Sequence, residues 1–151
     1  LDYYAPVYLY QDLMDRKQIY QFHKTNDVFV SAHRGEGWGI PQVEAMSVGN
    51  CIISSNRGGV HEYLEHKKNA LLVSGKMVNL VANTRNQHWY NTSQQWFEVD
   101  ENNLRENMRW ALTYKDKSVK KIGETAKRFV ENNFNFNAVG ATMRERLEST
   151  K

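Results

Sequence analysis

The sequence predicts an α/β fold, a Rossmann-like parallel sheet with flanking helices that is followed by C-terminal helices. Short apolar runs alternate with helical segments over residues 7–73, and glycine or proline stands at several of the junctions. From residue 101 onward, apolar residues recur only with the helical period. A chain of 151 residues is also long enough for one domain with its own core.

The first half of the chain predicts regular alternation. We expect strands at 7–10, 28–32, 51–54 and 70–73, and helices from Asp12 to about Lys24, at 41–48 and at 59–65. Asp12 suits a helix N-cap, Pro41 suits a first helical turn because it lacks an N–H, and Gly49 suits a helix end. The valine-rich strand at 28–32 is expected to be buried on both faces, which favours a parallel sheet with right-handed crossovers.

The second half predicts an insertion and then helices. Residues 74–100 form a polar stretch rich in asparagine and glutamine, in which we expect no regular element. Asp100, Ser118 and Asn135 each precede a segment with helical period. The three apolar faces are Leu104, Met108, Ala111 and Leu112; then Val119, Ile122, Ala126, Phe129 and Val130; and then Phe136, Val139, Met143 and Leu147.

Composition excludes several classes of protein. Cys51 is the single cysteine, so no internal disulfide forms, and we expect it to be a small core residue. The longest apolar runs are far shorter than the roughly 20 residues that span a bilayer, and no signal-peptide pattern is present, so we expect a cytoplasmic protein. The net charge of +3 suits an anionic ligand but does not demand nucleic acid, and we expect none.

The run at 33–49 carries the chemistry. Glu36 and Glu44 stand eight positions apart, across a glycine-rich turn and the start of the helix predicted at 41–48. Free N–H groups at a helix start favour an anion, and Gly37 and Gly39 allow the backbone to approach a phosphate closely. A carboxylate can accept two hydrogen bonds from a vicinal diol. The run therefore predicts a diphosphate site in which one glutamate holds a ribose and the other a hexose.

Later segments complete an ordered pattern over about fifty residues, with a strand at 51–55, the sequence Gly-Gly-Val-His-Glu at 58–62 and an apolar strand at 70–73. The whole pattern resembles the E-x7-E motif of retaining glycosyltransferases of family four, the group 1 glycosyl transferases, which have the GT-B fold. The resemblance implies that residues 1–151 are a single, partial nucleotide-sugar-binding domain, the C-terminal half of a GT-B enzyme. It also implies that the N-terminal acceptor domain is absent from this chain.

The resemblance assigns roles to individual residues. Glu36 would approach the reacting carbon of the donor sugar, as a nucleophile or as an electrostatic stabiliser, and Glu44 would bind the nucleotide ribose or act as a helix-dipole carboxylate. Arg34 would reach a phosphate, because a fork of donors suits phosphate, although a surface arginine fits the position equally well. The remaining donor-binding residues are Gly37, Trp38, Gly39, Ile40, Gly58 and Gly59, with the backbone N–H groups of 37–40 facing the sugar and the distal phosphate.

The implied reaction is attack by an acceptor hydroxyl on the anomeric carbon while a nucleoside diphosphate leaves, with retention of configuration. No Asp-x-Asp pair is present, and His33 and His61 lack a matching ligand cluster, so we expect metal-independent transfer without a cofactor. The expected partners are a UDP- or GDP-linked sugar and a glycan, lipid or protein acceptor, in the cytoplasm or at the cytosolic face of a membrane. The alternative is a catalytically silent nucleotide-sugar-binding module or subunit.

The insertion at 74–100 contains four large aromatic residues, Trp89, Tyr90, Trp96 and Phe97. They would either stack on an acceptor sugar or pin the insertion to the body of the domain. Large aromatic side chains in a long loop more often pin that loop, because their apolar surface stabilises the fold when it is buried. We therefore favour pinning.

Overall fold

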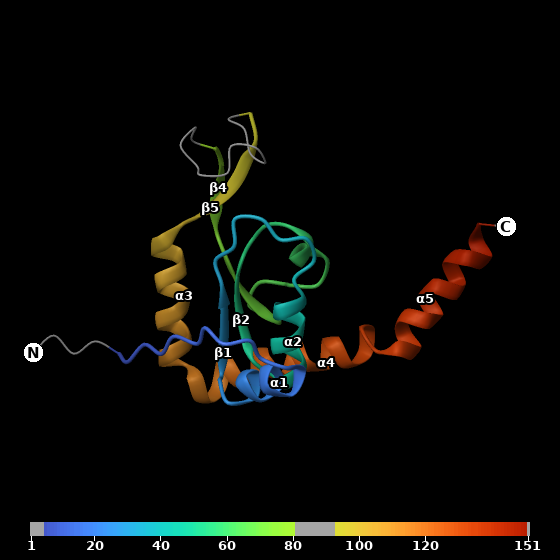
Figure 1. Ribbon diagram of the computed structural model, residues 1–151, viewed down its shortest axis with the longest axis horizontal. Coiled ribbons are helices and arrows are strands. Elements are labelled where there is room, and N and C mark those ends of the chain that lie inside the picture. Colours follow the sequence, from blue (N-terminus) through green and yellow to red (C-terminus); the bar gives the residue numbers. More distant parts are fainter. Residues whose placement is uncertain (1–4, 81–92, 151) are drawn as a thin grey trace, which may run out of the picture.

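The computed structural model describes residues 5–80 and 93–150 and contains a parallel sheet at its centre (Figure 1). Its strands are β1 (Val28–Ser31), β2 (Cys51–Ser55) and β3 (Ala70–Val73), which lie side by side in that order. Val30 is paired with Ile53, and Ile53 with Leu71. The Rossmann-like α/β fold expected from the alternating pattern is confirmed.

Helices cover both faces of this sheet, with α2 and α3 on opposite sides (Figure 1). In chain order the helices are α1 (Arg16–Lys24), α2 (Ile40–Val48), the 3₁₀ turn η1 (Gly59–Glu62), α3 (Glu101–Thr113), the π-helical turn η2 (Lys115–Val119), α4 (Lys120–Asn133) and α5 (Phe136–Ser149). Ile52 packs with Met46 of α2 on one face, and Ile53 packs with Ala111 of α3 on the other. α4 contributes to both layers, through Ala126 and Ile122 respectively.

Cys51 lies in the core, as expected. Its thiol is fully buried in β2, and burial raises its pKa to about 12. A thiol held in its neutral form behaves as a small apolar side chain, so no reactive role follows from its environment.

The strand predicted at 7–10 does not form. These four side chains are between 64% and 92% exposed, and the segment pairs with no strand among the described residues. An apolar run becomes a strand only where a neighbouring strand takes up its backbone hydrogen bonds.

The first helix begins at Arg16, later than the predicted start at Asp12. Asp15 is the N-cap, and its carboxylate accepts a hydrogen bond from the Gln18 N–H at 2.8 Å. The Gln18 amide oxygen accepts the Asp15 N–H in return, also at 2.8 Å. This reciprocal capping box satisfies two backbone donors at once, which a cap at Asp12 does not.

The helix predicted at 59–65 shortens to the single turn η1. Beyond it, the Asn69 side chain forms hydrogen bonds with backbone groups that a longer helix would use. Its amide nitrogen donates to the Tyr63 carbonyl and its oxygen accepts the Glu65 N–H, each at 2.7 Å. Asn69 is 1% exposed, so this alternative hydrogen bonding is protected from water.

The insertion at 74–100 is not without regular structure. It contains the antiparallel pair β4 (Gly75–Asn79) and β5 (Gln95–Val99), which stands at one end of the sheet (Figure 1). The prediction made for Trp89 and Tyr90 lies outside the described residues. Phe97 is 6% exposed, so at this position the pinning interpretation is confirmed.

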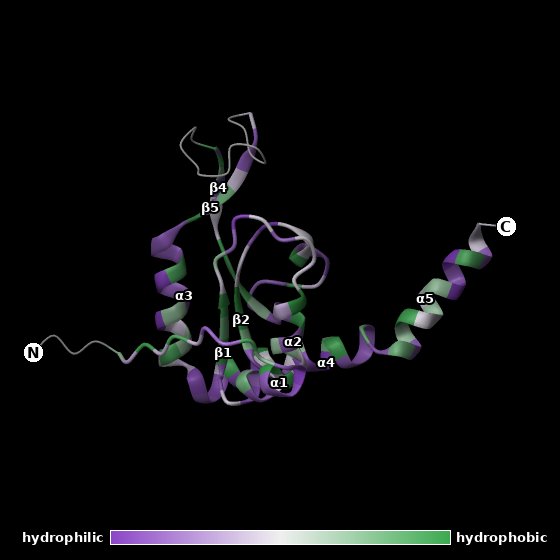
Figure 2. Cartoon of the chain, in the orientation of Figure 1, coloured by the Kyte–Doolittle hydropathy of each residue, from purple (hydrophilic) through white to green (hydrophobic). Residues whose placement is uncertain are grey.

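Two elements leave apolar surface uncovered. Val30 is 40% exposed because β1 is an edge strand of this sheet, so the expected burial on both faces is wrong for β1. α5 projects from the body, and apolar and polar residues alternate along it (Figure 2). Phe136 and Leu147 on this helix are 100% and 67% exposed. Within residues 5–80 and 93–150, no helix is long and apolar enough to cross a membrane.

We expect Gly123→Ala to lower the free energy of unfolding by about 1–3 kcal/mol, the range for overpacked interiors. A methyl group at Gly123 of α4 would collide with the Gly49 carbonyl at the end of α2, and backbone cannot move aside cheaply. Urea unfolding followed by circular dichroism measures the change.

Gly140→Ala is the matched control, since it also lies inside a helix but has no atom within 4 Å of the added methyl group. It should leave the free energy unchanged or raise it by up to about 1 kcal/mol. Equal effects of the two substitutions would contradict the close approach of α2 and α4.

Candidate functional site

The glycine loop, residues 35–39, leads from β1 to α2 and lies directly against the turn that follows β2. The Gly59 N–H donates to the Glu36 carbonyl at 3.4 Å. A side chain at Gly58 would meet this carbonyl, and one at Gly59 would meet the carbonyl of Gly37. Gly58 also has a φ of 91°, which favours glycine. The structure thus brings together Glu36, Gly58 and Gly59 past the ends of neighbouring strands, as expected for a ligand crevice in an α/β sheet.

Tyr63 holds the other end of the loop. Its hydroxyl lies 2.7 Å from the Trp38 carbonyl oxygen and 3.1 Å from that of Gly39, and it donates its hydrogen between them. Gly39 has a φ of 95°, and a side chain there would collide with this hydroxyl. Burial, and then the negative charge of Glu36, raise the pKa of Tyr63. Sequence reasoning missed Tyr63, because a tyrosine directly after a short turn carries no recognisable pattern.

Trp38 packs rather than standing free. Its ring centroid is 5.3 Å from that of Tyr63 and 5.0 Å from that of Phe134, and Phe129 lies 5.6 Å from Phe134. Edge-to-face and tilted contacts at these distances are favourable for aromatic rings. The ring of Trp38 remains 37% exposed. The cluster therefore joins the glycine loop to the end of α4.

A chain of polar groups fixes the segment before the loop. His33 Nε2 lies 2.9 Å from the Arg57 carbonyl, which only accepts hydrogen bonds, so Nε2 carries the proton. His33 Nδ1 then accepts from the Ser31 hydroxyl at 3.1 Å, and Ser31 accepts from the Gln42 amide at 3.3 Å. The Ser55 hydroxyl donates to the His33 carbonyl at 2.7 Å. His33 is thus a link between β1, α2 and the turn after β2.

Gly35 and Gly37 differ from the other glycines of the site. Neither has a positive φ, and a methyl group at either position would meet nothing within 4 Å. Packing and backbone conformation therefore do not require glycine at these two positions. The open space lies on both sides of Glu36, whose side chain is half-buried.

The start of α2 continues this open surface. Gly39 is the N-cap, and no side chain accepts a hydrogen bond from the first turn. Ile40 is 62% exposed, and Glu44 is exposed one turn further along, away from the buried side formed by Gln42, Ala45 and Met46. An uncapped helix start carries partial positive charge and free N–H groups, so it favours an anion.

Arg34 faces the hairpin formed by β4 and β5. Its guanidinium donates to Glu98 at 3.2 and 3.4 Å and lies 4.2 Å above the centre of the Trp96 ring. Its carbonyl accepts the Phe97 N–H at 2.9 Å. The donors of the guanidinium therefore face β5 of the hairpin.

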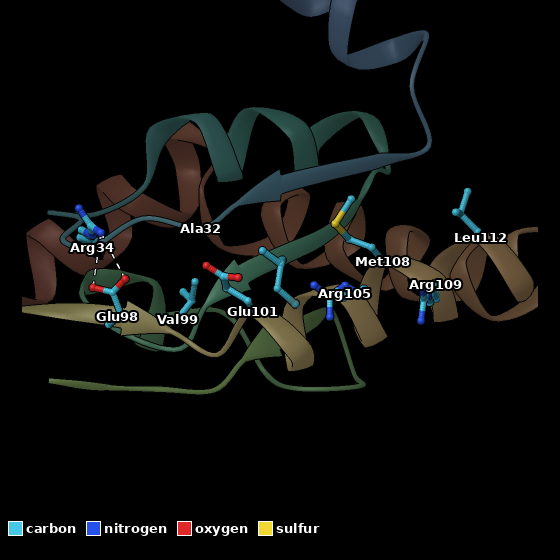
Figure 3. A pocket seen from close by; sticks show the side chains of 10 residues that line it. Ala32, Arg34, Glu98, Val99, Glu101, Arg105, Met108, Arg109 and Leu112 are labelled. Atoms are coloured by element: carbon cyan, nitrogen blue, oxygen red, sulfur yellow. Dashed lines mark hydrogen bonds and ion pairs between the residues drawn. The ribbon is translucent and has the colours of Figure 1, made fainter. Parts of the chain in front are cut away.

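A groove of about 790 Å³ lies beside the glycine loop, between Ala32 and α3 (Figure 3). Arg34 and Glu98 face each other at one end of it, and Leu104, Met108 and Leu112 supply apolar lining. Glu36, Gly37 and the start of α2 do not line this groove. Among the residues that the structure describes, no three His, Cys, Asp or Glu side chains are grouped to hold a metal ion.

These observations define a Rossmann-like domain with a glycine loop at the carboxyl ends of its parallel strands. The family model for glycosyl transferases group 1 matches residues 6–89, more than half of the 151 residues. The chain therefore belongs to the glycosyl transferases group 1 family, and the resemblance identified from the sequence is confirmed. The comparison with curated proteins finds no match.

Two solved structures have the same fold. A glycosyltransferase from Rickettsia africae ESF-5 superposes with a TM-score of 0.62 at 20% identity, covering 89% of this chain and 29% of that one. The C-terminal domain of a glycosyl transferase group 1 family protein (LpcC) from Francisella tularensis superposes with a TM-score of 0.56 at 16% identity, covering 84% and 53% respectively. The chain thus spans less than two thirds of either solved structure.

We expect Tyr63→Phe to lower the free energy of unfolding at neutral pH by about 0.5–1.5 kcal/mol, because the two loop carbonyls lose their donor. It should also reduce the dependence of stability on alkaline pH. The folded protein holds the Tyr63 proton above the usual pKa of about 10, so the unfolded chain ionises first and stability falls as pH rises further. Phenylalanine does not titrate.

Urea unfolding at neutral pH and at a series of values above pH 10 measures both effects. Tyr8→Phe is the control, since Tyr8 is 76% exposed. An unchanged alkaline slope in Tyr63→Phe would contradict the placement of this hydroxyl.

Proposed function

We propose that this chain is the donor-binding part of a glycosyltransferase that uses a nucleotide-activated sugar. The observation that carries the proposal is the open space at Gly35 and Gly37, on either side of Glu36. Neither glycine is required by packing, so their lack of a side chain is best explained by a ligand that approaches the backbone closely. Membership in the glycosyl transferases group 1 family supports a sugar nucleotide as that ligand.

The anionic part of the donor fits the start of α2. A diphosphate there would receive the free N–H groups of the first helical turn and of the glycine loop, together with the favourable helix dipole. As the bond to the anomeric carbon breaks, negative charge grows on the leaving nucleoside diphosphate. Preorganised N–H groups stabilise that charge more than they stabilise the bound donor, which is the condition for catalysis.

Glu36 would face the transferred sugar. Its backbone carbonyl accepts the Gly59 N–H and its side chain is half-buried, between the open spaces at Gly35 and Gly37. It would stabilise positive charge at the anomeric carbon, or attack this carbon directly, and the acceptor hydroxyl then completes transfer with retention. Glu44 would accept the two hydroxyls of the ribose from its exposed place on α2.

The proposal requires no divalent cation, because helix and loop N–H groups neutralise the diphosphate and the sequence has no Asp-x-Asp pair. UDP or GDP is the proposed nucleotide, and a glycan, lipid or protein supplies the acceptor hydroxyl. The second candidate is a nucleotide-sugar-binding module without catalysis. The small share of the Rickettsia africae structure that this chain covers favours testing binding before transfer.

The first test is titration of the isotopically labelled chain with UDP, GDP and ADP and with their common sugar conjugates, followed by amide NMR. Saturable shifts centred on residues 35–44 and 58–62 are expected, for one nucleotide in preference to the others. Shifts confined to other regions of a folded chain, or none at all, would overturn the proposal. Binding without donor turnover when acceptors and the acceptor domain are supplied would favour the silent module.

We expect Glu36→Ala to reduce turnover by about 10²–10³ in an enzyme that contains both domains, as for loss of one preorganised stabiliser. Nucleotide binding should change little, because Glu36 is placed beside the sugar and not the diphosphate. Single-turnover transfer measures the first effect, and NMR titration with the free nucleotide measures the second. Turnover within a few fold of the native rate would contradict the assigned role.

Glu44→Ala should chiefly weaken nucleotide binding, by about 10-fold or more, since a charge-assisted hydrogen bond contributes about 1.5–3 kcal/mol. Glu124→Ala is the matched control, because Glu124 is also an exposed glutamate inside a helix. Isothermal titration with the preferred nucleotide compares the two. Equal affinities would leave Glu44 with a helix-dipole role alone.

A further inference from the structure

We propose that Arg34 is a positioning residue through which the β4–β5 hairpin holds the glycine loop and thereby places Glu36. The consequence for donor binding rests on the proposed function, whereas the coupling between hairpin and loop does not. Arg34 precedes Glu36 by two residues, and β5 of the hairpin lies more than sixty positions further along the chain.

Three contacts of different kinds join Arg34 to β5. The guanidinium donates to both carboxylate oxygens of Glu98, at 3.2 and 3.4 Å, which Figure 3 shows as the two dashed lines. The same guanidinium lies 4.2 Å above the centre of the Trp96 ring, a cation–π distance. The Arg34 carbonyl accepts the Phe97 N–H at 2.9 Å. One strand, β5, therefore contacts both the side chain and the main chain of Arg34.

The hairpin itself is anchored, so it can serve as a fixed support. Phe97 is buried and packs where a side chain at Gly75 would collide with it. The Asp100 N–H donates to the Ser74 carbonyl at 2.8 Å, which closes the base of the hairpin where α3 begins. Because the hairpin is fixed at its base, where α3 begins, it can hold Arg34 in place.

The glycine loop needs support on this side. Its far end is held by Tyr63 and its middle by the turn at Gly58 and Gly59. Gly35 and Gly37, in contrast, have no atoms close to the place of a side chain. Arg34 is therefore the anchor immediately before Gly35, where packing leaves open space, and Glu36 is the next residue along the loop.

An ion pair this exposed contributes little to folding stability. The side chains of Arg34 and Glu98 are 53% and 42% exposed, and solvent screens such pairs strongly. Substitutions here should consequently shift the loop while leaving the fold intact. A shift of the loop without a loss of stability would therefore report a positioning role.

The alternative is that Arg34 binds a donor phosphate directly, as its place in the sequence also suggests. The two roles predict opposite results for a charge exchange. If Arg34 binds phosphate, Arg34→Glu with Glu98→Arg leaves a carboxylate beside the donor, and binding stays weak. If Arg34 positions the loop through Glu98, the exchanged pair restores the link and binding recovers.

The experiment compares the native chain with Arg34→Glu, Glu98→Arg and the double exchange. Lys120→Glu is the control, because Lys120 forms a more exposed ion pair with Asp116, at 3.4 Å, outside the loop. Three quantities are measured: the amide shifts of Gly35, Glu36 and Gly37 without ligand, the dissociation constant of the preferred UDP- or GDP-sugar, and the thermal midpoint. Glu98→Gln replaces Glu98→Arg if the reversed charge unfolds the chain.

We expect each single variant to move the three loop amides and to weaken nucleotide-sugar binding by about 10-fold, since small misplacements in a binding site carry such costs. The thermal midpoint should stay near the native value, and the double exchange should restore both amide shifts and affinity. Single variants with native loop shifts, or a double exchange that recovers nothing, would overturn the inference. If the native chain binds no nucleotide sugar, the proposed function fails, and the loop shifts alone still decide the coupling.

Discussion

The close approach of two backbone segments is the constraint on which the site depends. The carbonyls of Glu36 and Gly37 lie where side chains at Gly58 and Gly59 would be, so the glycine loop and the turn after β2 can meet only because both carry glycine. The parallel pairing of β1 with β2 brings these two segments to the same edge of the sheet. Any side chain at Gly59 would push the loop away and open the crevice between them.

The remaining contacts of the loop distribute its support over distant parts of the chain. Tyr63 fixes the carbonyls before α2, the Trp38 and Phe134 rings connect the loop to the end of α4, and Arg34 connects it to β5. The free surface that is left consists of Gly35, Gly37 and the first turn of α2. A loop that is held along its length but keeps open space at Gly35 and Gly37 suits a ligand that contacts main-chain N–H groups, because the donors are oriented before the ligand arrives.

Two elements with uncovered apolar surface, α5 and β1, form without full burial. α5 keeps its helical form although none of its residues is buried, because Asn135 caps its first turn and most of its residues favour helix. β1 likewise forms with one edge unpaired, since its pairing with β2 and the packing of Phe29 are sufficient. Both elements therefore form for local or one-sided reasons.

The sequence by itself determined the parallel strands, α2, the C-terminal helices and the membership in the glycosyl transferases group 1 family. These features arise from short-range patterns, such as Pro41 at a helix start and Gly49 at its end, which act within a few residues. The cap of α1 is a local pattern as well, because Asp15 and Gln18 stand three positions apart. Tertiary structure decided the outcome where local patterns competed or where interacting residues are far apart in the chain. Asn69 shortened the turn after Gly59, and β5 reached Arg34 across more than sixty residues. Such choices depend on which groups meet in space, and a linear pattern does not contain that information.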